Sequence, residues 1–141
     1  SYHGFMPIVV HAVSQDEFQG WMSAKRADKE AQVAASQVDR SLEDVVTEGE
    51  SVYNTACLAC HGAQGEGGVG KAIAGSSIAM GDLGVHLDAG IKGVAGTAMQ
   101  AFGAQLSDVE MAAVITYQRN AFGNNTGDVV QPSDVAQHKQ G

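Results

Sequence analysis

Apolar positions recur at helical spacing in two stretches of this chain, which predicts two amphipathic helices. The apolar face of the first comprises Leu42, Val45, Val46, Gly49, Tyr53 and Cys57. The second runs from Ser107 to about Asn120 and opens with a capping box, because Glu110 follows the serine after three residues. Between the two helices, residues 62–96 are rich in glycine and permit only short helical turns, the best of them over 85–91. This part of the chain is therefore predicted to be all-α with long loops.

The N-terminal segment has a different pattern. Residues 5–13 are rich in β-branched side chains and predict a strand, which Pro7 places at a strand start or a sheet edge. A capping box over residues 14–17 then predicts a short helix that runs to about Lys25. Residues 26–41 are polar and alanine-rich without a strong apolar face, so we expect a partly helical linker.

Length and composition allow one small domain with an extension. The chain has 141 residues, of which 44% are apolar, enough for a core, but only 6% are aromatic. We expect the domain to occupy residues 42–125, to follow an N-terminal segment of 1–25 and the linker of 26–41, and to precede a flexible tail of 126–141. With so few aromatic side chains, something else is expected to help fill the centre of the domain.

The charge balance excludes one class of partner. Acidic side chains outnumber basic ones by 16 to 8, a net charge of −8, whereas a nucleic-acid partner requires a basic surface. The longest apolar run near the start, residues 6–10, is far shorter than the roughly 20 residues that span a bilayer, so no membrane-spanning segment is predicted. No signal peptide is predicted either.

Both cysteines lie in one motif, Cys57-Leu58-Ala59-Cys60-His61, which is typical of c-type haem attachment. Positions i, i+3 and i+4 share a helix face, so two thiols and an imidazole can point at one flat ligand. The thiols of Cys57 and Cys60 can form thioethers with the two vinyl groups, and His61 can ligate the iron. A covalent haem c would also supply the missing centre of a domain of about 80 residues.

Three other uses of the cysteines are weaker. A thioredoxin-like redox pair belongs in a βαβ setting, which the pattern does not show. A structural zinc site needs four ligands, and the chain offers no second pair. A disulfide across so short a loop would stabilise little.

The sixth iron ligand is expected to be Met99, which lies in a loop shortly before the last predicted helix. Met80 and His86 are weaker candidates, and for His86 a position at the surface or at the haem edge is the simpler interpretation. Met111 lies within the helix and is expected in the core. Methionine and histidine together raise the reduction potential and leave no open site for O₂, which favours electron transfer over catalysis.

Residues from about Leu42 to Asn125 resemble class I cytochromes c. The matching positions are Gly49, Tyr53, residues 57–61, the glycine-rich run 67–70, Met99 and Tyr117. The resemblance implies the fold of that family around a covalent haem, with the first and last helices crossing where Gly49 meets Tyr117. Two departures from the family are Lys71 and Gln100, which stand where proline is common.

A narrower resemblance links the chain to subunit II of caa3-type haem-copper cytochrome c oxidases. Residues 97–103, 106–108 and 113–117 are similar to the cytochrome c domain fused to that subunit. Residues 3–10 resemble the end of its dinuclear copper (copper-A) motif, which implies that His3 and Met6 are copper ligands in an intact subunit.

On this resemblance, residues 1–25 are the strand-and-helix remnant of a cupredoxin domain. The two bridging cysteines of the copper motif would precede Ser1, so we expect a C-terminal fragment that cannot assemble copper-A alone. A match of His3 and Met6 by chance, as terminal residues, is the alternative that stays open.

The resemblance implies a one-electron carrier on the periplasmic side of a bacterial inner membrane. Its partners would be the other oxidase subunits and the copper-A domain, with a quinol-oxidising complex or a soluble cytochrome c as donor. No side chain needs to act as acid, base or nucleophile, so the chain alone is not expected to catalyse a reaction. A free-standing periplasmic cytochrome c, and a haem-based sensor or enzyme, are the alternatives.

Overall fold

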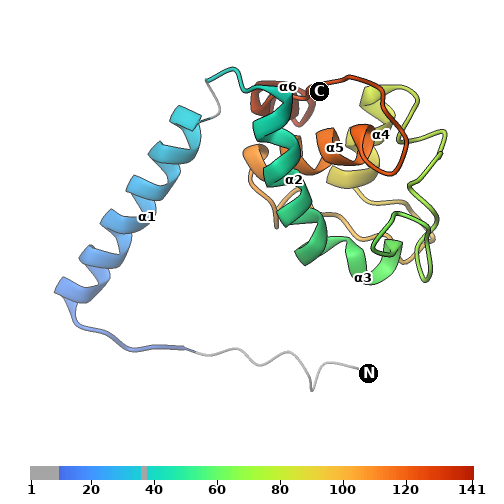
Figure 1. The fold of residues 1–141 in the computed structure, drawn as a ribbon. Coiled ribbons are helices and arrows are strands. Elements are labelled where there is room, and N and C mark those ends of the chain that lie inside the picture. The colour runs from blue at the N-terminus through green and yellow to red at the C-terminus, as the bar shows by residue number, and fades with distance from the viewer. Residues whose placement is uncertain (1–9, 36–37) are drawn as a thin grey trace, which may run out of the picture. The chain divides into compact units, whose positions relative to one another are not determined.

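The computed structural model describes residues 10–35 and 38–141, and every regular element in these residues is a helix. The helices are α1 (Gln15–Ala35), α2 (Leu42–Ala56), α3 (Leu58–His61), α4 (Leu83–Ile91), α5 (Asp108–Asn120) and α6 (Pro132–His138) (Figure 1). The described chain divides into two compact units at residues 31 and 32. The predicted all-α architecture is confirmed for the part of the chain that the structure describes.

The predicted strand over 5–13 is not found where it can be checked. Residues 10–13 have no regular structure, and residues 1–9, which include His3 and Met6, lie outside the described residues. The structure therefore shows no cupredoxin remnant in its described part. None of the helices in that part is long and apolar enough to cross a membrane.

Helix α1 starts where the sequence predicted and continues further. Ser14 and Glu17 form the expected cap, with the serine amide donating to the glutamate carboxylate at 2.9 Å. The helix then runs to Ala35, whereas the prediction ended it near Lys25. Residues 26–35 consist mostly of alanine, lysine, arginine, glutamate and glutamine, which are strong helix formers and need no apolar face. The predicted linker is therefore helical over 26–35.

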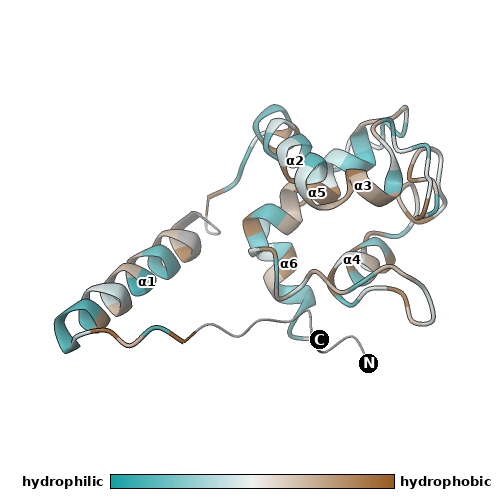
Figure 2. Ribbon diagram, turned by 90° about the horizontal axis from the view of Figure 1, so that it is seen from below, coloured by the Kyte–Doolittle hydropathy of each residue, from teal (hydrophilic) through white to brown (hydrophobic). Residues whose placement is uncertain are grey.

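The second unit is built on the contact between α2 and α5, which lie against each other in both views (Figures 1 and 2). Gly49 marks their closest approach, since a Cβ added there would lie 2.1 Å from the carbonyl oxygen of Ala113 and 2.6 Å from Cβ of Tyr117. Only a residue without a side chain permits this distance. The predicted crossing of Gly49 against Tyr117 is confirmed.

The core lies around this crossing. Its largest fully buried side chains include Tyr53, Met111 and Ile115, so the expected place of Met111 in the core is confirmed. Tyr53 also packs against the rings of Tyr117 and Phe122, and its hydroxyl donates to the carbonyl of Gly62 at 2.7 Å. This bond joins α2 to the loop that follows the cysteine motif.

The predicted flexible tail over 126–141 is wrong, because this segment is folded onto the domain. Val130 and Val135 are fully buried, and Pro132 starts α6. Asp128 pairs with Arg119 of α5, and the amide of Val130 donates to the hydroxyl of Thr116 at 2.9 Å. The segment is polar overall, so its few apolar residues gave no periodic signal.

Replacing Gly49 by alanine is expected to destabilise the second unit. The new methyl group would force α2 and α5 apart, at a cost of about 1–3 kcal/mol for overpacking. Denaturant unfolding of the haem-loaded protein measures the free energy. The control is Gly20→Ala in α1, where an added Cβ meets nothing within 4 Å. Equal stability of the two variants would contradict the proposed role of Gly49.

Candidate haem-attachment site

The cysteine motif lies at the junction of two helices. Cys57 ends α2 and its carbonyl oxygen accepts bonds from the amides of Cys60 at 3.2 Å and His61 at 3.0 Å. These bonds hold the three residues on one helical turn, as the spacing predicted. Cys57 is buried and Cys60 is exposed, and neither is in a disulfide. Both thiols are therefore available for attachment.

The imidazole of His61 has a fixed orientation. Its Nδ1 lies 2.7 Å from the carbonyl oxygen of Lys71. A carbonyl oxygen can only accept a hydrogen bond, so Nδ1 carries a proton, and in the neutral ring Nε2 keeps the lone pair that a metal needs. The departure from proline at Lys71 thus leaves the supporting bond intact, as expected, because the bond uses only the backbone.

Glycines of the following loop make room for this ring. A Cβ added at Gly70 would lie 2.8 Å from Cε1 and 3.0 Å from Nδ1 of His61. The loop is held against the motif by the amide of Gly70, which donates to the carbonyl of Cys60 at 2.8 Å, and by that of Gly67, which donates to the carbonyl of His61 at 2.7 Å. The glycine-rich run therefore leaves the space that the imidazole of His61 occupies.

Met99 lies half-buried in the loop between α4 and α5. The backbone fixes its place, since the carbonyl of Met99 accepts a bond from the amide of Val94 at 3.1 Å and its amide donates to the hydroxyl of Thr97. Of its rivals, Met80 is 49% exposed in the loop before α4, and His86 is buried within α4. Ligation of iron by Met99 stays a prediction.

The sequence model of one protein family, described as Cytochrome C oxidase, cbb3-type, subunit III, matches residues 44–117, just over half of the chain. The chain belongs to this family of cytochrome c domains. Its activity is haem-based electron transfer, and its cofactor is a covalent haem c. No curated protein shows significant sequence similarity to the chain.

The residues of this cytochrome c domain fit such a group. Two unpaired thiols flank one turn, and the adjacent imidazole has its metal-binding nitrogen unprotonated. Cys57 and Cys60 would form the thioethers and His61 would ligate the iron, which supplies a one-electron couple. The donor set of sulfur and imidazole on a single turn leaves no need for a second ligand pair, in contrast to zinc.

The surroundings of Cys57 argue against a thioredoxin-like use of the pair. Burial, and to a smaller extent the nearby Cys60, raises the pKa of the Cys57 thiol to about 11. Thiol–disulfide exchange depends on a thiolate with a lowered pKa. In this cytochrome c domain the Cys57 thiol is therefore poorly suited to redox exchange.

The sequence analysis missed a polar contact to the attachment site. Gln118 of α5 is buried, and its side-chain amide donates to Sγ of Cys57 at 3.8 Å. The oxygen of the same amide lies 2.9 Å from Nε2 of His86, which orients the amide group. The available signal was a polar residue seven positions after Met111, on the apolar face of the last helix.

His86 is thus not at the surface, which corrects that part of the expectation, whereas its place at the haem edge stays a prediction. It is only 5% exposed, and its Nδ1 has no protein partner. Burial lowers the pKa of His86 to about 4, and the bond to Gln118 opposes this shift only in part. The side chain is neutral at pH 7 and serves as a buried support for Gln118.

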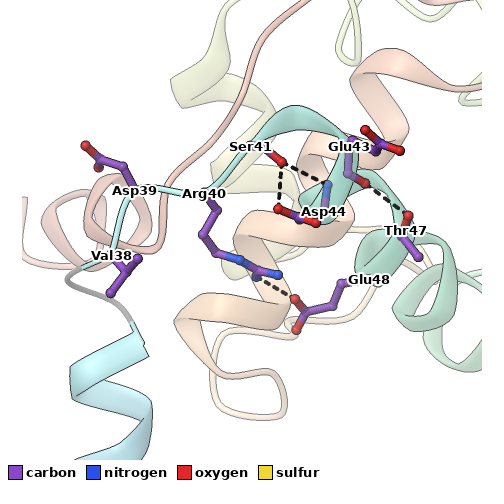
Figure 3. Close-up of a pocket in the computed structure, with 8 residues that line it drawn as sticks. All are labelled: Val38, Asp39, Arg40, Ser41, Glu43, Asp44, Thr47 and Glu48. Atoms are coloured by element: carbon purple, nitrogen blue, oxygen red, sulfur yellow. Dashed lines mark hydrogen bonds and ion pairs between the residues drawn. The ribbon is translucent and has the colours of Figure 1, made fainter.

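A hollow at the start of α2 is a poor alternative site (Figure 3). Its polar side chains already bind one another. Arg40 pairs with Glu48 at 2.5 Å, and Ser41 donates to the carboxylate of Asp44 at 2.7 Å. No cluster of histidine, cysteine and acidic side chains suited to a metal ion occurs in residues 10–35 and 38–141. The cysteine motif therefore remains the predicted functional site.

Stability is expected to fall as the pH is lowered from about 6.5 to about 4, with a contribution from His86. In this window the unfolded chain binds a proton at His86 that the folded state excludes, so each unit of pH removes folding free energy. The full window accounts for about 3 kcal/mol. Denaturant unfolding at pH 7 and pH 4.5 measures the change.

The variant His86→Leu is expected to lose this part of the pH dependence. His11→Leu, at an exposed position in the other unit, is the control and should keep it. If His86→Leu and the unaltered protein lose the same free energy between the two pH values, the burial of a neutral histidine is not what the pH dependence reports.

Proposed function

We propose that this cytochrome c domain carries electrons one at a time into a respiratory haem-copper oxidase, as the domain fused to subunit II. The observation that carries the electron-transfer function is the geometry of the motif, in which one turn presents two free thiols and an imidazole with a fixed tautomer. The link to an oxidase is supported by the resemblance of residues 97–103 and 113–117, and by the description of the matching family.

In this proposal the chain's residues hold and orient, and none of them reacts. His61 would bind the iron, the carbonyl of Lys71 fixes its ring, and Met99 would be the second iron ligand from the protein. With two ligands from the protein, the iron would have no open site for oxygen. The domain is therefore suited to exchange electrons and unsuited to reduce oxygen itself.

The N-terminal part supports the attachment to subunit II. Residues 10–31 belong to a different compact unit from the cytochrome c domain. Residues 26–41 would connect donor and acceptor and so raise their effective concentration. His3 and Met6 would complete copper-A only in the intact subunit, on the periplasmic side of the inner membrane.

The charge of the domain favours a basic donor. Residues 42–122 carry nine acidic and three basic side chains, a net charge of −6 before the haem is counted. Such a surface would guide a basic donor, a quinol-oxidising complex or a soluble cytochrome c, in a manner that salt weakens. The same charges would also serve solubility alone, and transfer rates from a basic and an acidic donor across ionic strength distinguish the two roles.

A free-standing periplasmic cytochrome c is the second candidate. It is favoured by the second unit, which has its own core and a folded C-terminal segment. The two candidates share the haem chemistry and differ only in the electron acceptor.

The axial ligand is tested by Met99→Ala. Loss of a thioether ligand is expected to abolish the weak far-red band of methionine-ligated ferric haem and to lower the reduction potential. A redox titration followed by absorbance measures both. Met80→Ala is the control, because this methionine is exposed and should leave the band in place. A band that survives Met99→Ala would refute this ligand.

The attachment to subunit II is tested by the sequence encoded before Ser1. We expect a C-x-x-x-C pair there, which would supply the bridging thiolates of copper-A. Protein expressed with that upstream segment should then form a thiolate-bridged, mixed-valence copper spectrum, which His3→Ala should abolish. An upstream sequence without the cysteine pair would favour the free-standing cytochrome instead.

A further inference from the structure

The loop that carries Met99 is anchored at both of its ends. It leaves α4 after Ile91 and reaches α5 at Asp108. Its returning part is bonded to the last turn of α4, because the amide of Phe102 donates to the carbonyl of Gly90 at 3.0 Å and that of Gly103 to the carbonyl of Ile91 at 3.1 Å. Any movement of the loop away from the domain must therefore break contacts near Gly103 and α4.

Two consecutive residues at the end of α6 contact α4 and the returning part of the loop. Nε2 of His138 donates to Oδ1 of Asp88 in α4 at 2.7 Å. Nζ of Lys139 donates to the carbonyl oxygen of Gly103 at 3.0 Å and to Oδ1 of Asp108 at 2.7 Å. The pair thus joins the helix before the loop, the end of the loop and the helix after it.

Helix α6, which carries His138 and precedes Lys139, is packed against the rest of the domain. Val135, one turn before Lys139, is fully buried. At the other end of α6, the side chain of Gln131 bonds the backbone of Arg40 in both directions, with its oxygen 3.0 Å from the amide and its nitrogen 3.2 Å from the carbonyl. The segment is therefore rigid enough to restrain the loop that it contacts.

We propose that His138 and Lys139 form a clamp that restrains the Met99 loop and so sets how readily Met99 leaves the iron. The inference rests on the proposed function, in which Met99 is the axial ligand. Both clamp residues lie beyond residues 44–117, the part of the chain that matches the family. They are positioning residues, since each acts on the loop backbone or on its flanking helices.

The test compares Lys139→Met with Lys92→Met in the haem-loaded protein. Both variants lose one positive charge from a lysine that binds an aspartate. Lys92, at the end of α4, pairs with the same Oδ1 of Asp88 that His138 binds, but none of its polar contacts reaches Gly103 or Asp108, so it is the control for the Lys139 arm alone. A double variant, His138→Leu with Lys139→Met, removes both arms of the clamp.

Two measurements report on the loop. Hydrogen exchange at the amides of Phe102 and Gly103 is expected to be roughly two- to fivefold faster in Lys139→Met and faster still in the double variant. Imidazole added to the ferric protein should replace Met99 on the iron and abolish the far-red band. In the clamp variants this should occur at a correspondingly lower imidazole concentration than in the unaltered protein. Lys92→Met should match the unaltered protein in both.

The outcomes separate the inference from the proposed function. Unchanged exchange and imidazole affinity in the double variant, or equal changes in Lys92→Met, would overturn the clamp while the far-red band of the unaltered protein upholds the ligand. An unaltered protein that lacks the band would overturn Met99 as the ligand, and with it the clamp.

Discussion

The hydrogen bond from His61 to the carbonyl of Lys71 decides what the imidazole can do. By fixing the proton on Nδ1, it leaves the opposite nitrogen free to bind a metal and holds the ring in one orientation. The bond forms only because Gly70 lets the loop approach the ring to a distance that no larger residue would allow. Attachment chemistry, ligand geometry and the course of the following loop all depend on this contact.

Local pattern was sufficient to predict the main helices and the helical turn that holds the cysteine motif. The apolar spacing along α2 and α5 is strong, and Cys57, Cys60 and His61 are adjacent in sequence, so their relation does not depend on the rest of the fold. The crossing at Gly49 followed from the family resemblance, and the close contact with Ala113 gives it a physical reason.

Features that depend on distant contacts were not predictable in this way. Helix α6 is short and polar, and it is held by side chains of α5 and by the backbone before α2. The buried side chains of Gln118 and His86 are hydrogen-bonded although they lie 32 positions apart in the sequence. The local sequence around either residue gives no sign of this contact. The length of α1 was underestimated for the opposite reason, since its second half depends on helix propensity and not on an apolar face.

A polar C-terminal segment therefore has a structural role in this domain. It covers α5 and α4 and approaches the loop of the expected axial ligand, so a small haem domain gains contacts that its few aromatic residues do not supply. Stabilisation of this kind adds buried valines and charged bonds without a larger core.

The central claim, that a haem is bonded to the two cysteines, is tested most directly by the mass of the intact protein. Produced in a host that matures c-type cytochromes and then denatured, the chain should retain its colour and exceed the mass of its polypeptide by one haem. The variant with Cys57→Ala and Cys60→Ala should not. A colourless product with the mass of the bare polypeptide from the same host would contradict the account.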